Sequence, residues 1–146
     1  MDVAALIISI LAIIISVIVA AVQIAKNKKI NDINLEAELS KEIVKVYLTE
    51  IFPKAVSDVS FKKKRLTNIA PLQKALIGLR VKLKFYIYCD NEFYQNLKRQ
   101  LQDLEDYIVN NEDRYFGFDA QKEVRQIIYL KMTEIYSLLK KKYKDG

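Results

Sequence analysis

Histidine is absent from this chain, and cysteine occurs only once, as Cys89. The missing imidazole excludes serine-type catalytic triads and every zinc or iron site that needs a histidine ligand. A single cysteine cannot form an intrachain disulfide, so nothing in the sequence indicates an oxidising compartment. We predict no catalytic residue, no metal and no cofactor, and therefore a protein that is not an enzyme. Cys89 itself is predicted to be a small, buried core residue.

Helix-breaking residues are also scarce, with three glycines and two prolines in 146 residues. Leucine, isoleucine, lysine and glutamate dominate instead, and few breakers among straight-chain residues favour helices over short strands. The sequence therefore predicts an all-α fold. Its length is sufficient for one well-packed core.

Positive charge is missing from the N-terminal part of the chain. All 24 lysines and arginines lie at or after Lys26, and so do 17 of the 18 acids, Asp2 being the exception. Val3 to Val22 form an uncharged, apolar run of twenty residues. As a helix this run is about 30 Å long, the thickness of a bilayer's hydrocarbon core. We predict a transmembrane anchor over residues 1–25, and a retained one, because a cleaved signal peptide has a basic segment before a shorter apolar run.

Three lysines that follow the apolar run predict its orientation. Lys26, Lys28 and Lys29 lie in a polar connector, residues 26–34. Since positive residues stay on the cytoplasmic side, the N-terminus is expected outside and the remaining domain in the cytoplasm. The same lysines form a cluster that can contact anionic lipid at the membrane surface.

One stripe of the predicted span is small or polar. Its members are spaced alternately by four and three residues: Ala5, Ser9, Ala12, Ser16, Val19 and Gln23. Small residues let two membrane helices approach closely, and serine or glutamine can then hydrogen-bond between them. This stripe predicts a transmembrane self-association seam.

Residues 35–146 are predicted to form a cytoplasmic bundle of about four antiparallel helices. Three apolar stripes at helical spacing begin at Leu72, Phe93 and Val124. Pro53 is expected to kink or end the first helix, with a further turn after it. Thr67 or Asn68, Asp90 and Asp119 are the expected N-caps of the following helices.

Basic residues are concentrated in two neighbouring segments of this domain. Lys62, Lys63, Lys64 and Arg65 form a run that we interpret as a loop, and Lys74, Arg80, Lys82 and Lys84 share the next helix. Cations near tyrosines can bind phosphates and stack bases, so a polyanion site is one interpretation. A solvated helix surface is the other.

The favoured function is a single-pass membrane protein whose cytoplasmic helical domain is a non-enzymatic interaction or sensing module. It contacts membrane lipids and binds a protein partner or itself. One alternative is an oligomerising membrane effector, of a phage-defence or toxin type, which requires a high oligomer that Ser9→Leu with Ser16→Leu should abolish. The second alternative is a membrane-tethered nucleic-acid or nucleotide binder. The layout resembles that of small membrane proteins from AT-rich bacteria and their phages, a likeness of composition that assigns no residue a role.

Overall fold

The computed structural model describes the backbone of residues 3–144 and the side chains of residues 12–143. The chain divides into two compact units, residues 1–39 and residues 40–146. Each unit is described by itself.

Helix α1 spans Val3–Glu42. Its residues up to Leu39 form the first unit, and the remainder of the helix belongs to the second unit. Residues 1–52 contain neither glycine nor proline, so nothing interrupts the helix, and the predicted connector 26–34 is helical as well. Within the described part of the chain, no helix carries an apolar stretch long enough to cross a membrane. The first residues of the predicted anchor, up to residue 11, have side chains that lie outside those described. Ala5 and Ser9 of the predicted seam belong to this part.

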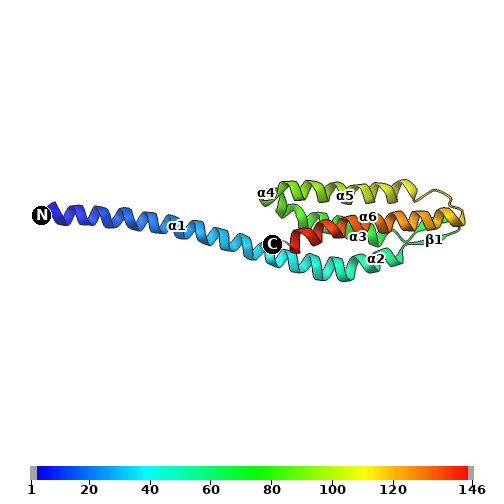
Figure 1. Cartoon of the computed structure of the whole chain (residues 1–146), viewed down its shortest axis with the longest axis horizontal. Coiled ribbons are helices and arrows are strands. Elements are labelled where there is room, and N and C mark those ends of the chain that lie inside the picture. The colour runs from blue at the N-terminus through cyan, green and yellow to red at the C-terminus, as the bar shows by residue number, and fades with distance from the viewer. Residues whose placement is uncertain (1–2, 145–146) are drawn as a thin grey trace. The chain divides into compact units, whose positions relative to one another are not determined.

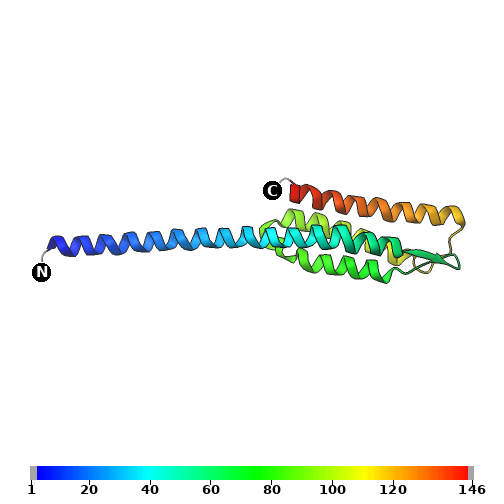
Figure 2. The ribbon, with the colours of Figure 1, turned by 90° about the horizontal axis from the view of Figure 1, so that it is seen from below.

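The second unit is a helical bundle with a small hairpin at one end (Figure 1). The elements in chain order are the π-helix η1 (Ile43–Ile51), α2 (Phe52–Asp58), β1 (Ser60–Lys62), β2 (Arg65–Thr67), α3 (Ala70–Lys82), the 3-10 turn η2 (Leu83–Phe85), α4 (Tyr86–Cys89), α5 (Asn91–Asn111) and α6 (Phe118–Lys144). The helical segments η1–α2, α3–α4, α5 and α6 lie side by side, and each runs opposite to the one before it (Figures 1 and 2). The predicted helical bundle is confirmed.

The predicted apolar stripes form the core of this bundle. The most deeply buried side chains are Leu72, Leu76, Leu79 and Leu83 from the second segment and Leu97, Leu101, Leu104 and Ile108 from α5. Val124, Ile128, Ile135 and Leu139 contribute from α6. A fully buried leucine or isoleucine stabilises the fold by about 1.5–3 kcal/mol, so these stripes supply most of the driving force.

Helix ends agree with the sequence at one place and differ at another. Asp90 caps α5 as predicted, because its Oδ1 accepts a hydrogen bond from the Phe93 N–H at 3.1 Å. Neither Thr67 nor Asn68 caps α3; Ile69 occupies that position without a side-chain hydrogen bond. Thr67 is unavailable because it belongs to strand β2.

The chain remains helical through Pro53, so of the two predicted outcomes, a kink or an end, the helix does not end at this residue; the further turn after it is confirmed. Immediately before the proline the helix is of the π type, and the Phe52 N–H donates to the Tyr47 carbonyl five residues earlier. Pro53 stands in the first turn of α2, where a missing N–H removes no necessary hydrogen bond. Asp119 similarly lies inside the first turn of α6, which begins at Phe118, and does not cap it.

Candidate functional site

The basic run Lys62–Arg65 is a β-hairpin, so its interpretation as a loop is wrong. Strands β1 and β2 are antiparallel, with Lys62 opposite Arg65 and Phe61 opposite Leu66. Lys63 and Lys64 form the two-residue turn with φ angles of 51° and 67°. Two successive positive φ values are typical of the tight turns that match the twist of paired strands, and asparagine and glycine adopt them most readily. The four cationic side chains of this run are exposed.

Contacts with the loop between α5 and α6 hold the hairpin in place. The Phe116 N–H donates to the Lys64 carbonyl at 2.8 Å, and the Phe116 ring lies edge-on to Phe61 with centroids 5.8 Å apart. Leu66, which stands opposite Phe61 in the strand pair, is buried. The turn is therefore fixed by the fold on one side while its lysines extend into solvent on the other.

Two exposed aromatic rings of the same region lie next to cations. The Arg65 guanidinium lies 4.4 Å from the Tyr115 ring centroid and donates to its hydroxyl at 3.0 Å, and Lys122 lies 4.5 Å from the Phe118 centroid. Tyr115 and Phe118 are still 70% and 73% exposed. We call Phe61–Arg65, Tyr115, Phe116, Phe118 and Arg125 together the hairpin end.

A groove of about 320 Å³ adjoins the hairpin end between α2 and α6. It is lined by Val56, Val59, Arg125, Gln126, Ile128 and Tyr129. Val59 and Ile128 are almost fully buried and form an apolar floor, whereas Tyr129 is 67% exposed. Arg125 connects the groove to the hairpin, because its guanidinium lies 5.4 Å from the Phe61 ring and donates to the Val59 carbonyl at 3.4 Å. No binding site predicted from the sequence includes these groove residues.

The structure does not bring all the predicted polyanion-binding residues together. Arg80 forms an ion pair with Glu105 of α5, and Lys82 pairs with Glu42 at 2.9 Å. The hydrogen bond that Lys82 donates to Glu42 raises the pKa of Lys82 above its ordinary value. Lys74 and Lys84 are exposed on α3 and η2. Of the eight predicted residues, Lys62–Arg65 alone belong to the hairpin end.

The predicted membrane-proximal residues lie along α1. Lys26, Lys28, Lys29 and Gln23 are exposed on this helix. In the predicted seam, the Ser16 hydroxyl donates to the Ala12 carbonyl at 2.8 Å within the same helix. This bond satisfies the donor without a partner helix.

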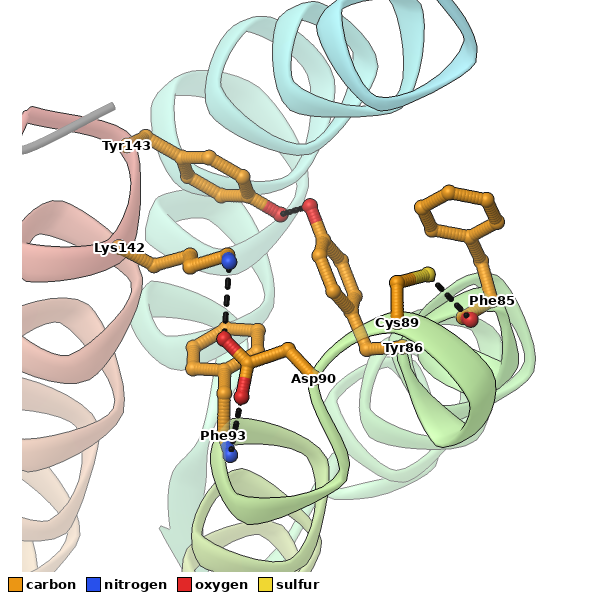
Figure 3. A network of polar contacts seen from close by, with 7 residues as sticks. All are labelled: Phe85, Tyr86, Cys89, Asp90, Phe93, Lys142 and Tyr143. Atoms are coloured by element: carbon orange, nitrogen blue, oxygen red, sulfur yellow. Dashed lines mark hydrogen bonds and ion pairs between the residues drawn. The ribbon is translucent and has the colours of Figure 1, made fainter. Parts of the chain in front are cut away.

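A second cluster lies at the opposite end of the bundle, where α6 meets the junction of α4 and α5 (Figure 3). Lys142 Nζ lies 2.8 Å from Asp90 Oδ2, and 5.2 and 5.6 Å from the ring centroids of Tyr86 and Phe93. The Tyr86 hydroxyl donates to that of Tyr143 at 3.3 Å. We call Tyr86, Asp90, Phe93, Lys142 and Tyr143 the C-terminal cluster; it joins the last turns of α6 to the start of α5.

Cys89 lies beside this cluster and is exposed, so its predicted burial is wrong. Its Sγ donates to the Phe85 carbonyl at 3.1 Å (Figure 3). The apolar stripe ends with Tyr86, and Cys89 follows on the outer side of the last turn of α4. Its position makes the thiol accessible to reagents.

The Asp90–Lys142 pair makes stability depend on pH. The hydrogen bond from Lys142 lowers the Asp90 pKa, and the Phe93 N–H lowers it further. Because the folded-state pKa is depressed, the stabilisation is complete above the ordinary aspartate pKa of about 4 and is lost as pH falls through the lower, folded value.

Asp90→Asn keeps an N-cap but removes the ion pair, so it should lower the free energy of unfolding at pH 6 by about 0.5–1 kcal/mol, since both groups are partly exposed. The difference from wild type should shrink as pH falls below the ordinary aspartate pKa of about 4 and through the lower, folded value. Denaturant titrations across this pH range measure it. In a Lys142→Met background the same substitution should show a smaller pH dependence, the part that the hydrogen bond from the Phe93 N–H leaves in place; an undiminished dependence there would show that Lys142 is not the main cause of the Asp90 effect.

Within the described residues, no group of three or more Cys, Asp and Glu side chains lies close enough together to hold a metal ion. No protein-family model, curated protein or solved structure matches the chain.

Proposed function

We propose that this is a single-pass membrane-anchored protein whose helical bundle is a non-enzymatic interaction module that recruits a protein partner to the membrane. The supporting observation is the apolar surface of α1. Three consecutive residues, Ile13, Ile14 and Ile15, are 64%, 49% and 60% exposed. Consecutive helical residues point about 100° apart, so these three residues present apolar side chains to solvent in three different directions around the helix. A helix of that kind requires an apolar environment, in a core or in a bilayer.

The orientation proposed for the anchor places the bundle in the cytoplasm. Lys26, Lys28 and Lys29 follow the apolar residues and are exposed on α1. Positive residues just after a span are retained on the cytoplasmic side, and anionic lipid attracts each by about 1 kcal/mol. The hairpin end supplies the surface for a partner, since its cations and the Tyr115 and Phe118 rings are exposed on a backbone that the fold holds in place.

The exposed thiol of Cys89 allows a direct test, because it is the sole cysteine of the chain. A membrane-impermeant maleimide should leave Cys89 unlabelled in intact expressing cells and should label it after permeabilisation. As a control, a cysteine inserted before Val3 in a Cys89→Ser background should react in intact cells. Labelling of Cys89 in intact cells would contradict the cytoplasmic placement.

The oligomerising effector remains an alternative prediction. In the described part of its seam, the Ser16 hydroxyl is bonded within its own helix, and Gln23 is exposed. Both observations are compatible with a self-association seam and with a plain anchor, and neither adds support for the effector over the interaction module.

A further inference from the structure

We infer that the hairpin end and the adjoining groove bind an acidic peptide segment that carries one apolar anchor side chain. The inference rests on the proposed function, in which the bundle recruits a protein partner, and it specifies the chemistry of the segment that is recognised.

The charge of the hairpin selects for acidic partners. Residues 59–68 contain Lys62, Lys63, Lys64 and Arg65 and no carboxylate. The neighbouring loop carries Glu112 and Asp113 beside Arg114, so positive charge is concentrated on the hairpin itself. Complementary charge across an interface speeds association and selects the partner, and a turn whose backbone is already fixed loses little backbone freedom on binding.

The groove supplies the place for an apolar anchor. Its floor is formed by Val59 and Ile128, and Tyr129 lies exposed at its edge. A volume of about 320 Å³ is at the lower end for small-molecule pockets, which suits one side chain better than a cofactor. An aromatic or aliphatic side chain buried in such a pocket is the usual source of affinity in a peptide interface.

Arg125 makes these two features one surface. It lines the groove and lies over Phe61 of β1, two residues before the turn. A single strand of nucleic acid could bind the cations through its phosphates and stack its bases on the exposed rings. It carries no aliphatic side chain that would fill the apolar groove. The apolar groove next to the basic hairpin therefore favours a peptide over a nucleic acid.

The experiment is a selection of displayed random peptides of about ten residues on the full-length protein in detergent micelles. Enriched peptides should carry net negative charge and at least one Leu, Ile, Phe or Tyr. A synthetic copy of one enriched peptide should bind with an affinity that Lys63→Asn with Lys64→Gly lowers about tenfold and that rising salt weakens. Tyr129→Ser should weaken it independently of salt.

The double substitution in the turn separates binding from folding. Asparagine and glycine fit the positive φ angles of 51° and 67°, so this variant should melt about 3 °C higher than wild type while it binds less well. Lys74→Gln with Lys84→Gln removes the same charge from α3 and η2 and is the matched control, which should leave binding unchanged.

Enrichment of neutral or basic peptides, enrichment of none, or equal weakening by the turn variant and the control would overturn the inference. Tighter binding of oligo(dT) than of any peptide, with loss in the turn variant, would reassign the hairpin to nucleic acid. The membrane placement is tested separately by Cys89 labelling. If that labelling places the bundle in the cytoplasm but no acidic peptide is selected, the peptide inference is wrong and the proposed anchor still stands.

Discussion

Lysine substituted for both Ile13 and Ile14 is expected to release the protein from the membrane. Each replacement loses a favourable isoleucine and adds a charge near the middle of the proposed span. On the insertion scale the two together cost about 6–8 kcal/mol, as much as the apolar residues of the whole span contribute. The measurement is extraction of membranes with alkaline carbonate: wild type should stay in the pellet, and the variant should move almost completely to the supernatant.

The control uses the same chemistry on the same helix. Ile30 and Ile33 are 53% and 55% exposed and follow the three lysines that are proposed to mark the cytoplasmic surface. Lysine at both positions should leave the protein in the pellet, since neither residue lies within the span. Retention of the Ile13, Ile14 variant in the pellet would contradict the anchor, whereas release of both variants would place membrane contact further along α1.

The sequence predicts the bundle well because its core depends on local periodicity. Leu97, Leu101 and Leu104 recur at spacings of four and three. This spacing alone predicts both the helix and the face that it buries. Asp90 is predictable for a similar reason, because a side chain that caps a helix contacts an N–H only three residues away.

The candidate site was not predictable in the same way. The hairpin turn is formed by Lys63 and Lys64, which carry none of the glycine or asparagine signal that marks such turns. Its geometry is enforced from far along the chain by the hydrogen bond from the Phe116 N–H. The groove likewise combines α2 with α6, and no local pattern indicates which faces of two distant helices meet.

Two further features depend on tertiary contacts. Arg80, one of the predicted polyanion-binding residues, instead forms an ion pair with Glu105 on α5. Gly78 lies within α3, where alanine would favour a helix more. A Cβ added at Gly78 would lie 2.8 Å from the Tyr47 hydroxyl, so the glycine allows η1 to approach α3 closely.

Tyr86→Ala is expected to have the largest effect on the stability of the bundle. The side chain is fully buried in the C-terminal cluster, where its ring lies edge-on to Phe85 and Phe93 at centroid distances of 5.3 and 5.0 Å. Replacement of a buried aromatic residue by alanine costs about 3–5 kcal/mol, because apolar burial is lost and a cavity remains. Typical domains have a free energy of unfolding of about 5–15 kcal/mol, so this loss is a large fraction of the total.

Two control variants separate the ring from the hydroxyl and from the position. Tyr86→Phe keeps the buried ring and removes the hydroxyl, which donates to the Tyr143 hydroxyl. Tyr143 is half-buried and can bind water instead, so a loss of about 1 kcal/mol or less is expected. Tyr88→Ala removes a ring of the same size two residues later, but this ring is 92% exposed and should matter by no more than about 0.5 kcal/mol. Chemical denaturation of the three variants measures these values. If Tyr86→Ala cost no more than Tyr88→Ala, the C-terminal cluster would not hold α6 to the bundle.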